Sequence, residues 1–566
     1  MNSPSGAVKC LRALVLSVVA ILATRSGIAA KTDIDPLIIE TEAGRVQGVG
    51  ETGLRIFKGI PFAAPPVGDL RWRAPQPAPS WEGVRSAAAF GPRCMQSGSS
   101  LMNEDCLFVN VWTPADPSAK RGHHRLPVLV WVYGGSFTGG SGNIVPEALA
   151  RTGVIVVSFN YRVGTFGFIA HPQLSAESFA GVSGNYGLFD AMAALRWVRD
   201  NIDAFGGDAK NITLFGQSAG ASVITLLQVS PLAKGLYQKV ILESPGSMRH
   251  MKNLAQSEAL GLTLGPDLAV LRSLPANQVP LIQNLGGGTA IRALFQPRII
   301  GGTQDGCVIP TEEREAFESG NMNVTPLLVG SNTNEGISFT GNYLVNTIAA
   351  YHSYLNDPII FGSYGATALQ LYPVSSDSEV RRAVADSFAD SQFHFGTRGV
   401  ARAMSRLEPN VYRYFFSRRA GGTGADPVHA AELDYVFGRV TNAAPYNEQD
   451  VALSAAMMEA WKRFALTGDP NGGAINNWPR YDARTDPMLR LDDTFDTVGF
   501  GIGRSNVNLD FVGDVLAATK GPGTPTSKKI RSQCTCERQN ANIHNNAGRH
   551  PFGAICQGPK VFKEER

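Results

Sequence analysis

Short apolar runs recur along the chain, separated by stretches in which apolar residues follow helical spacing. The runs are short, mostly apolar and contain many β-branched residues, as in parallel strands buried on both faces. They cover residues 128–133, 154–159, 211–215, 239–243, 326–330 and 411–416. Helical spacing is found over residues 187–205, 219–227 and 451–466. This alternation predicts an α/β fold in which helices cover both faces of a mostly parallel sheet.

Two long stretches, 246–325 and 337–410, do not follow this alternation of strand and helix. We expect them to be lid-like insertions over the carboxyl edge of the sheet, where ligands bind in such folds. With a β-rich opening over residues 37–73, they would belong to one large domain spanning residues 31–519.

The amino-terminal residues 1–30 have the pattern of a secretory signal peptide. Lys9 and Arg12 precede an apolar run over residues 13–23, and small residues follow up to Ala30. The run is too short to span a bilayer, although an uncleaved anchor is the alternative. We therefore expect a secreted or periplasmic protein with no integral membrane segment once the signal is removed.

The formal net charge of +3 is unevenly distributed, because the signal and residues 520–566 are both basic. The remaining body is mildly acidic and gives no case for nucleic-acid binding, which needs a basic face. Residues 520–566 have the composition of a disordered tail, with a small cysteine-bearing domain as the alternative.

The cysteines are interpreted on the expectation that the protein is exported. In an oxidising compartment Cys94 and Cys106 are candidates for one disulfide, and Cys307 is expected to be a buried free thiol. The state of three further cysteines stays open, namely Cys534, Cys536 and Cys556. The chain has no CxxC…CxxC or HExxH pattern, so we expect neither a metal site nor a cofactor.

The strongest chemical signal is FGQSAG, residues 215–220, between a predicted strand and a predicted helix. A nucleophile elbow requires this context, and side chains at Gly216 and Gly220 would collide with neighbouring backbone in so cramped a turn. Ser218 is therefore the candidate nucleophile, with an ordinary turn at a helix start as the alternative.

A second signal is WVYGGSF, residues 131–137, where a strand ends in a glycine-rich loop. Backbone N–H groups aimed at the oxygen that gains negative charge would stabilise the transition state of ester hydrolysis. We assign these donors to Gly135, Ser136 and Ala219, with a simple β-turn as the alternative for the loop.

At this point the chain resembles the type-B carboxylesterase and cholinesterase family of α/β-hydrolases, from Gly44 to about Phe511. The matching motifs, besides the elbow, are FKGIPFA at 57–63, EDCL at 104–107, NYR at 160–162, GNYGL at 184–188 and FGGD at 205–208. The resemblance implies an α/β-hydrolase fold and a serine esterase acting on small-molecule esters.

The resemblance also implies the other catalytic residues. The family's acid lies in GSNTNEG at 330–336, which gives Glu335, and its histidine opens HAAELDYVFG at 429–438, which gives His429. His429 would be the general base and acid, with Glu335 orienting it. Asp305 and Asp434 are alternative acids.

Further residues are assigned to structure by the resemblance. Cys94 and Cys106 resemble the family's amino-terminal disulfide, and Ser244 resembles a serine that hydrogen-bonds near the acid. Two internal ion pairs are implied, Arg71 with Glu104 and Arg162 with Asp190.

Three departures from the family pattern matter. Gln217 stands where the family commonly has Glu, which predicts altered hydrogen bonding without loss of activity. Ser136 replaces a glycine of the oxyanion loop and narrows the space for bulky alcohols, so tertiary-alcohol esters should be poor substrates. The loop between Cys94 and Cys106 is too short for the family's cation-binding tryptophan, so choline specificity is not expected.

Alternatives to a short-chain esterase are a lipase with long-chain preference and a non-catalytic, cholinesterase-like binding protein. The sequence leaves the natural ester and the oligomeric state open. Arginines are frequent in and just after the second insertion, and two explanations are open: they bind acidic substrates, or they lie on solvated helix faces. We prefer the second. The residues are Arg381, Arg382, Arg398, Arg402, Arg406, Arg413, Arg418 and Arg419.

Overall fold

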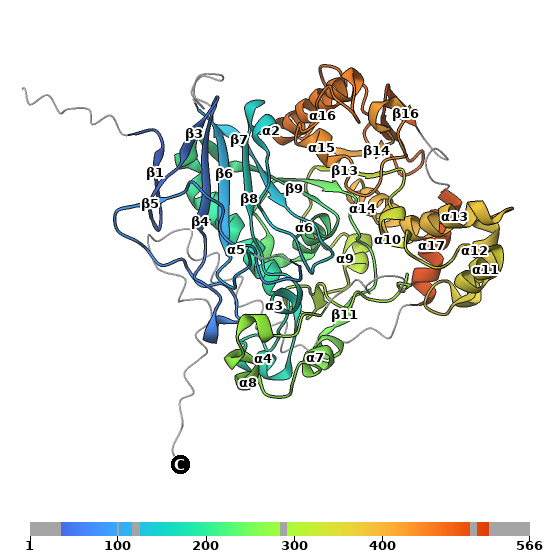
Figure 1. Ribbon diagram of the computed structural model, residues 1–566, viewed down its shortest axis with the longest axis horizontal. Helices are drawn as coiled ribbons and strands as arrows, with labels where there is room; N and C mark the ends of the chain where they lie inside the picture. Colours follow the sequence, from blue (N-terminus) through green and yellow to red (C-terminus); the bar gives the residue numbers. More distant parts are fainter. Residues whose placement is uncertain (1–34, 99–100, 116–124, 283–290, 499–505, 520–566) are drawn as a thin grey trace, which may run out of the picture.

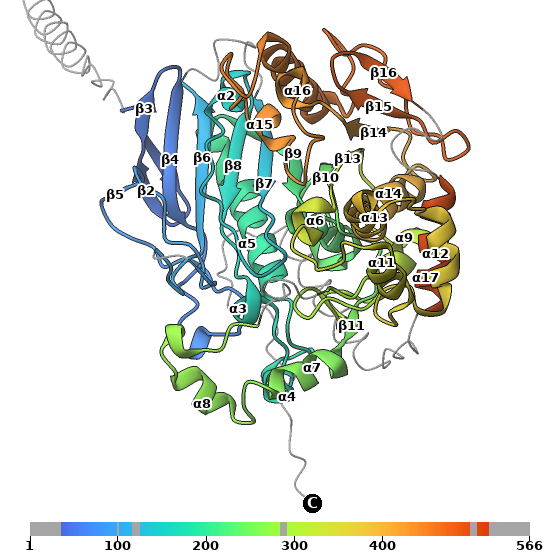
Figure 2. The same ribbon diagram turned by 45° about the vertical axis from the view of Figure 1, so that its right-hand side comes forward.

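The computed structural model describes residues 35–98, 101–115, 125–282, 291–498 and 506–519. An 11-stranded sheet runs through the molecule in the order β16-β15-β14-β13-β10-β9-β7-β8-β6-β4-β3, with helices on both sides of it (Figures 1 and 2). Its strands are β3 (Val49–Glu51), β4 (Leu54–Pro61), β6 (Phe108–Pro114), β7 (Leu126–Val132), β8 (Ile155–Phe159), β9 (Gly207–Gln217), β10 (Lys239–Glu243), β13 (Leu327–Asn332), β14 (Val411–Phe416), β15 (Met488–Leu491) and β16 (Phe495–Val498).

The middle of the sheet is parallel and its edges are antiparallel. From β8 through β7, β9, β10, β13 and β14 to β15, each strand pairs with its neighbour in parallel. All residues of β7, β8, β10, β13 and β14 are buried, which is why these strands lack polar alternation in the sequence. The predicted α/β class is confirmed, and each of the six predicted strands overlaps an observed one.

Two small sheets complete the β structure: β1 (Ile38–Thr41), β2 (Gly44–Gln47) and β5 (Val84–Ser86) form one, and β11 (Lys252–Asn253) with β12 (Thr303–Gln304) forms the other. The helices before β10 are α2 (Glu147–Arg151), α3 (Gly164–Phe168), α4 (Pro172–Glu177), α5 (Tyr186–Asn201) and α6 (Ala219–Val229). The three predicted helices correspond to α5, α6 and α16 (Glu448–Thr467), and α6 is buried along its whole length.

Helical segments fill the chain between β10 and β13 and between β13 and β14. The first holds α7 (Leu254–Leu262), α8 (Leu268–Ser273) and α9 (Glu313–Ser319). The second holds α10 (Ile337–Thr340), α11 (Ile348–Asn356), α12 (Gly365–Leu371), α13 (Asp377–Ala389), a π-helical turn at Asp390–His394 and α14 (Phe395–Met404). The short α15 (Leu433–Val436) follows β14.

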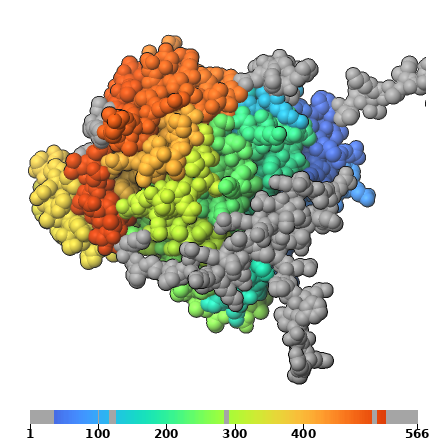
Figure 3. Space-filling view, turned by 180° about the vertical axis from the view of Figure 1, so that it is seen from behind, coloured from blue at the N-terminus to red at the C-terminus, as the bar shows by residue number. Residues whose placement is uncertain are grey.

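The last described helix, α17 (Asn506–Ala518), was not expected from the sequence. Phe511 on this helix packs against Phe361, with ring centroids 5.4 Å apart, and against Tyr364 at 6.3 Å. Seen from behind, α17 in red lies beside the yellow helices of the second segment (Figure 3). Helix α17 therefore packs on the segment that precedes β14. Within the described residues no helix is long and apolar enough to cross a membrane.

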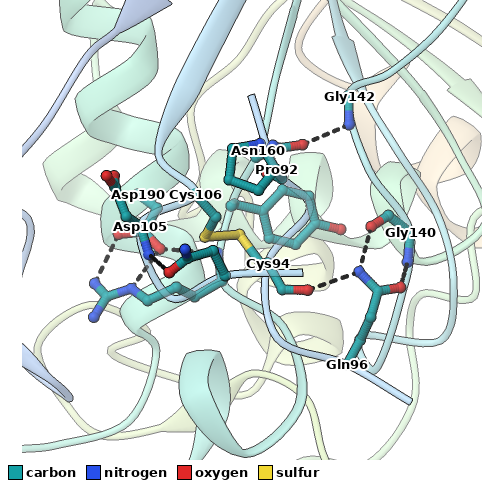
Figure 4. Close-up of a disulfide and its surroundings, with 12 residues drawn as sticks. Pro92, Cys94, Gln96, Asp105, Cys106, Gly140, Gly142, Asn160 and Asp190 are labelled. Atoms are coloured by element: carbon teal, nitrogen blue, oxygen red, sulfur yellow. Dashed lines mark hydrogen bonds and ion pairs between the residues drawn. A yellow bond between two sulfur atoms is a disulfide. The ribbon is translucent and has the colours of Figure 1, made fainter. Parts of the chain in front are cut away.

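The structure joins Cys94 and Cys106 in a disulfide next to the loop that follows β7 (Figure 4). Gln96 connects the disulfide to the loop: its amide donates to the carbonyl oxygens of Cys94 at 3.0 Å and Gly140 at 2.8 Å, and accepts from the Gly140 N–H at 2.8 Å.

Cys307 is disulfide-bonded, so the expectation of a free thiol is wrong. Both free and disulfide-bonded cysteines are commonly buried, so burial does not distinguish the two states.

Both ion pairs implied by the sequence are present and buried. A guanidinium nitrogen of Arg71 lies 2.6 Å from a carboxylate oxygen of Glu104. Arg162 holds Asp190 through two side-chain contacts of 2.7 Å, and its backbone N–H donates to the same carboxylate at 3.0 Å. Because Asp190 lies on α5, this pair attaches the helix to the segment after β8.

We expect Asp190→Asn to lower the free energy of unfolding by about 3–5 kcal/mol, since it leaves the Arg162 charge buried without its partner. Urea denaturation measures the loss. The control is Asp203→Asn, which breaks the half-exposed Arg125–Asp203 pair and should change stability by less than about 1 kcal/mol. Equal effects of the two substitutions would contradict the prediction.

Candidate active site

Ser218 lies in a sharp turn between β9 and α6, with φ 59° and ψ −125°. A non-glycine residue adopts this backbone only when its surroundings enforce it. The Ser218 N–H donates to the carbonyl of Glu243 on the next strand at 2.8 Å. A Cβ on Gly220 would lie 2.0 Å from the Val132 carbonyl oxygen, and one on Gly216 would lie 2.6 Å from the same atom. The two glycines therefore allow β7 to approach the turn.

The glycine-rich loop after β7 lies against this turn. Gly135 has φ 117° and Ser136 has φ 57°, so the loop curls back on itself, and the Thr138 and Gly139 N–H groups donate to the Gly135 carbonyl at 3.0 Å. Ala219 is the first residue of α6, where the N–H has no acceptor within the helix. Ser136, Ser218 and Ala219 line one cavity of about 270 Å³.

Glu335 follows β13 and its side chain is completely buried. One carboxylate oxygen accepts from the Ser244 hydroxyl at 2.5 Å and from the Asn332 N–H at 2.7 Å. The other contacts Nδ1 of His429. These contacts fix the carboxylate and leave one oxygen for the imidazole.

His429 comes from the loop after β14, and the loop after β13 holds it in place. The Asn334 N–H donates to the Pro427 carbonyl at 2.9 Å, and the Asn332 amide donates to the Val428 carbonyl at 2.8 Å. The imidazole packs against Phe339 and Phe393, which line the cavity; their ring centroids lie 5.0 and 4.5 Å from that of His429.

The second ring nitrogen of His429 faces Gln217, the residue before the candidate nucleophile. The Gln217 amide nitrogen lies 3.1 Å from Nε2. With the Nδ1 proton directed to Glu335, the Nε2 lone pair accepts from the Gln217 amide. Within the described residues no hydrogen bond joins Ser218 to His429, although the imidazole lies beside the turn through its contact with Gln217.

Two buried glutamates behind the histidine were not identified from the sequence. Burial and the charge of Glu335 raise the pKa of Glu432 to about 7, and the Asn332 amide donates to its carboxylate. Burial raises the pKa of Glu243 well above its ordinary value, and this side chain accepts from Trp461 at 2.8 Å. Glu432 is the acid of the HAAE sequence that begins at His429, so the sequence carried a signal for it.

The alternative acids are engaged elsewhere. Asp305 accepts from the Asn185 amide at 3.0 Å and from the Cys307 N–H at 2.9 Å, and Asp434 contacts Arg439 and Tyr446. The described part of the chain holds no group of three or more His, Cys, Asp or Glu residues that could bind a metal ion.

The arginine cluster noted in the sequence does not line the cavity. Three of its members, Arg398, Arg413 and Arg418, are buried in ion pairs with aspartates. These three contribute to packing, so the expectation of solvated positions is wrong for them. It is confirmed for the other five, which are exposed: Arg381, Arg382, Arg402, Arg406 and Arg419. Three other arginines line the cavity, Arg249, Arg292 and Arg298; isolated in sequence within the first insertion, they formed no recognisable motif.

A serine in a strained strand–turn–helix, with an acid and a histidine at neighbouring strand ends of an open, mostly parallel sheet, defines the α/β-hydrolase class. The profile of the "Carboxylesterase family" matches residues 35–509. The chain belongs to this family, the type-B carboxylesterases and cholinesterases, and is a carboxylesterase.

Characterised relatives and a solved structure agree with this assignment. The chain is 40% identical over 503 residues to a fumonisin B1 esterase of Sphingopyxis macrogoltabida, covering 85% of this chain and 92% of that protein. It is 35% identical to the para-nitrobenzyl esterase of Bacillus subtilis, covering 80% and 94%. A solved PNB esterase structure superposes with a TM-score of 0.71 at 33% identity, covering 84% of this chain and all of the other.

The raised pKa of Glu432 predicts a pH-dependent stability. A carboxyl whose pKa is about 7 in the folded protein and 4.5 ordinarily binds its proton more tightly when folded, so its contribution to stability falls as pH rises through this window. Relative to the native protein, Glu432→Gln should gain up to about 3 kcal/mol in free energy of unfolding between about pH 5 and about pH 8.

Urea denaturation at a series of pH values tests this expectation. Glu459→Gln is the control, because this carboxylate is 45% exposed on α16 and should show no such trend. A stability difference between Glu432→Gln and the native protein that does not change with pH would contradict the prediction.

Proposed function

We propose that the protein hydrolyses carboxylic esters through an acyl-enzyme on Ser218, with His429 as general base and then general acid and Glu335 as the orienting acid. The observation that carries the proposal is the position of His429. Its Nδ1 contacts the buried Glu335, and its Nε2 faces the residue next to Ser218.

In the first step the Ser218 hydroxyl oxygen bonds to the ester carbonyl carbon while its proton passes to His429 Nε2. The carbonyl oxygen becomes negative, and the N–H groups of Gly135, Ser136 and Ala219 are its proposed donors. Collapse of this intermediate breaks the bond to the alcohol, which leaves with the proton from His429. Water then attacks the acyl-enzyme by the same route and releases the acid.

Gln217 adds a step that the family pattern alone would not suggest. Its amide occupies the Nε2 lone pair of His429 at 3.1 Å, and a lone pair accepts one proton at a time. For transfer to begin, the Ser218 hydroxyl must replace the Gln217 amide at Nε2. We propose that substrate entering the cavity favours this exchange.

The competing functions have less support. A non-catalytic binding protein would not need Ser218 at φ 59°, because strain of this kind is retained where it serves a mechanism. A lipase for long acyl chains would need an apolar channel, whereas three arginines line this cavity.

We also propose that the protein is exported. Residues 1–30, the expected signal peptide, and residues 520–566, the expected tail, lie outside the described residues. The Cys94–Cys106 disulfide supports an oxidising destination, either secreted or periplasmic. The boundaries of the domain at 31–519, with insertions at 246–325 and 337–410, remain our proposal.

Ser218→Ala should lower kcat/KM for a short-chain aryl ester by about 10⁴-fold or more with an unchanged melting temperature, and Glu335→Gln should lower it by at least about 10²-fold. The matched control is Asp434→Asn, which alters a half-exposed carboxylate away from His429 and should retain activity. Full activity of Ser218→Ala, or no hydrolysis of any ester by the native protein, would refute the mechanism.

Ser136 should limit hydrolysis of tertiary-alcohol esters, because this residue lines the same cavity as Ser218 and, unlike glycine, carries a side chain. We expect tert-butyl acetate to react at least about 10²-fold more slowly than n-butyl acetate. Ser136→Gly should narrow this gap, since glycine accepts the φ of 57° without strain. Initial rates with both esters provide the measurement, and brisk hydrolysis of tert-butyl acetate by the native protein would contradict the prediction.

A further inference from the structure

The cavity beside Ser218 is strongly basic on one side. Arg249 lies after β10, and Arg292 and Arg298 lie in the segment before β12. All three are partly buried, and all three line the same cavity as Ser218 and Ala219. An ester positioned for attack by Ser218 therefore shares this space with three guanidinium groups.

Contacts within the protein hold these guanidinium groups without neutralising them. Arg292 lies over the rings of Phe339 and Phe388, at 5.3 and 5.7 Å from their centroids, and Arg298 lies over Phe137 at 5.3 Å. An aromatic face orients a guanidinium but leaves its N–H edge available.

The hydrogen bonds of these arginines go to neutral acceptors. Arg298 donates to the Gly246 carbonyl at 2.7 Å, and Arg249 donates to the Leu294 carbonyl at 3.2 Å. The Arg249 Nε is buried without a hydrogen-bond partner. Within the described residues none of the three forms an ion pair, in contrast to the buried pairs of Arg398, Arg413 and Arg418.

The nearby carboxylate of Glu313 offsets only part of this charge. Its oxygens already accept from the Thr225 hydroxyl and from the Met248 N–H at 2.8 Å. Burial lowers the pKa of all three arginines, and neighbouring guanidinium groups lower it further at Arg249 and Arg298. The pKa of Arg298 falls to about 10, which leaves it charged at neutral pH. Buried positive charges without partners are costly, and a bound anion would remove that cost.

We infer that this site takes esters that themselves carry free carboxylates, the chemistry of half-esters of dicarboxylic and tricarboxylic acids. The inference rests on the proposed function, because it assigns the ester bond to Ser218 and the carboxylates to Arg249, Arg292 and Arg298. A planar carboxylate accepts two parallel N–H bonds from a guanidinium, which fixes orientation as well as charge. Three guanidinium groups around one cavity suit a substrate with more than one such group.

The test compares esters of nearly equal shape that differ in charge. Monoethyl succinate places a carboxylate on the acid part, and ethyl succinamate is its neutral amide counterpart. The acetate ester of 3-hydroxypropanoate, with its amide as the neutral counterpart, places the charge on the alcohol part. Product formation by the full-length protein is measured for each pair at low salt and at about 0.5 M NaCl.

We expect kcat/KM for at least one charged ester to exceed that of its neutral partner by about 10–100-fold at low salt, as one or two charge-assisted hydrogen bonds provide. The preferred pair identifies which part of the ester meets the arginines, and salt should reduce the preference. Arg292→Gln and Arg298→Gln should bring the charged-to-neutral ratio toward one. Arg484→Gln, at a side chain 89% exposed, should leave the ratio unchanged.

Inhibition provides a measurement that needs no variant. Glutarate and citrate should inhibit hydrolysis of the neutral ester competitively, and glutaramide should not. If both neutral esters are hydrolysed through Ser218 while neither charged ester is preferred and the acids do not inhibit, the inference is overturned and the proposed function stands. If no ester in the set is hydrolysed, both fail.

Discussion

The backbone of Ser218 is the constraint on which the rest of the site depends. A serine at φ 59° between β9 and α6 is stable only because Gly216 and Gly220 let the turn pack onto β7 without a clash. The same turn makes Ala219 the first residue of α6, and both residues line the same cavity. The proposed nucleophile and one of the proposed oxyanion donors are therefore adjacent residues of a single turn.

The parallel sheet brings the remaining groups to that turn. β9, β13 and β14 all end at the same edge, and the loops that follow them carry Ser218, Glu335 and His429. Asn332 and Asn334 at the end of β13 hydrogen-bond the loop that bears His429. The histidine loop is consequently positioned by hydrogen bonds from the end of the strand that precedes the acid.

The sequence predicted what depends on local pattern. Apolar, β-branched runs predicted the buried strands, and the strand–glycine–helix context predicted the sharp turn at Ser218, which the structure contains. It did not reveal the contact of Gln217 with His429, the raised pKa of Glu432, or the basic side of the cavity. These features arise when residues distant along the chain are brought together by folding. Arg292 and Arg298 lie in a segment without regular periodicity, where only the packed structure shows which way the side chains face.

The Gln96 amide links a covalent cross-link to the loop that bears Gly135 and Ser136, since it bonds both Cys94 and Gly140. The consequence concerns how the protein is made. We expect a chain synthesised where thiols stay reduced to lack this cross-link, so that Cys94 and, through it, Gln96 are no longer tied to Cys106. Folded protein made under reducing and under oxidising conditions should therefore differ in activity, and folding assays alone would not report that difference.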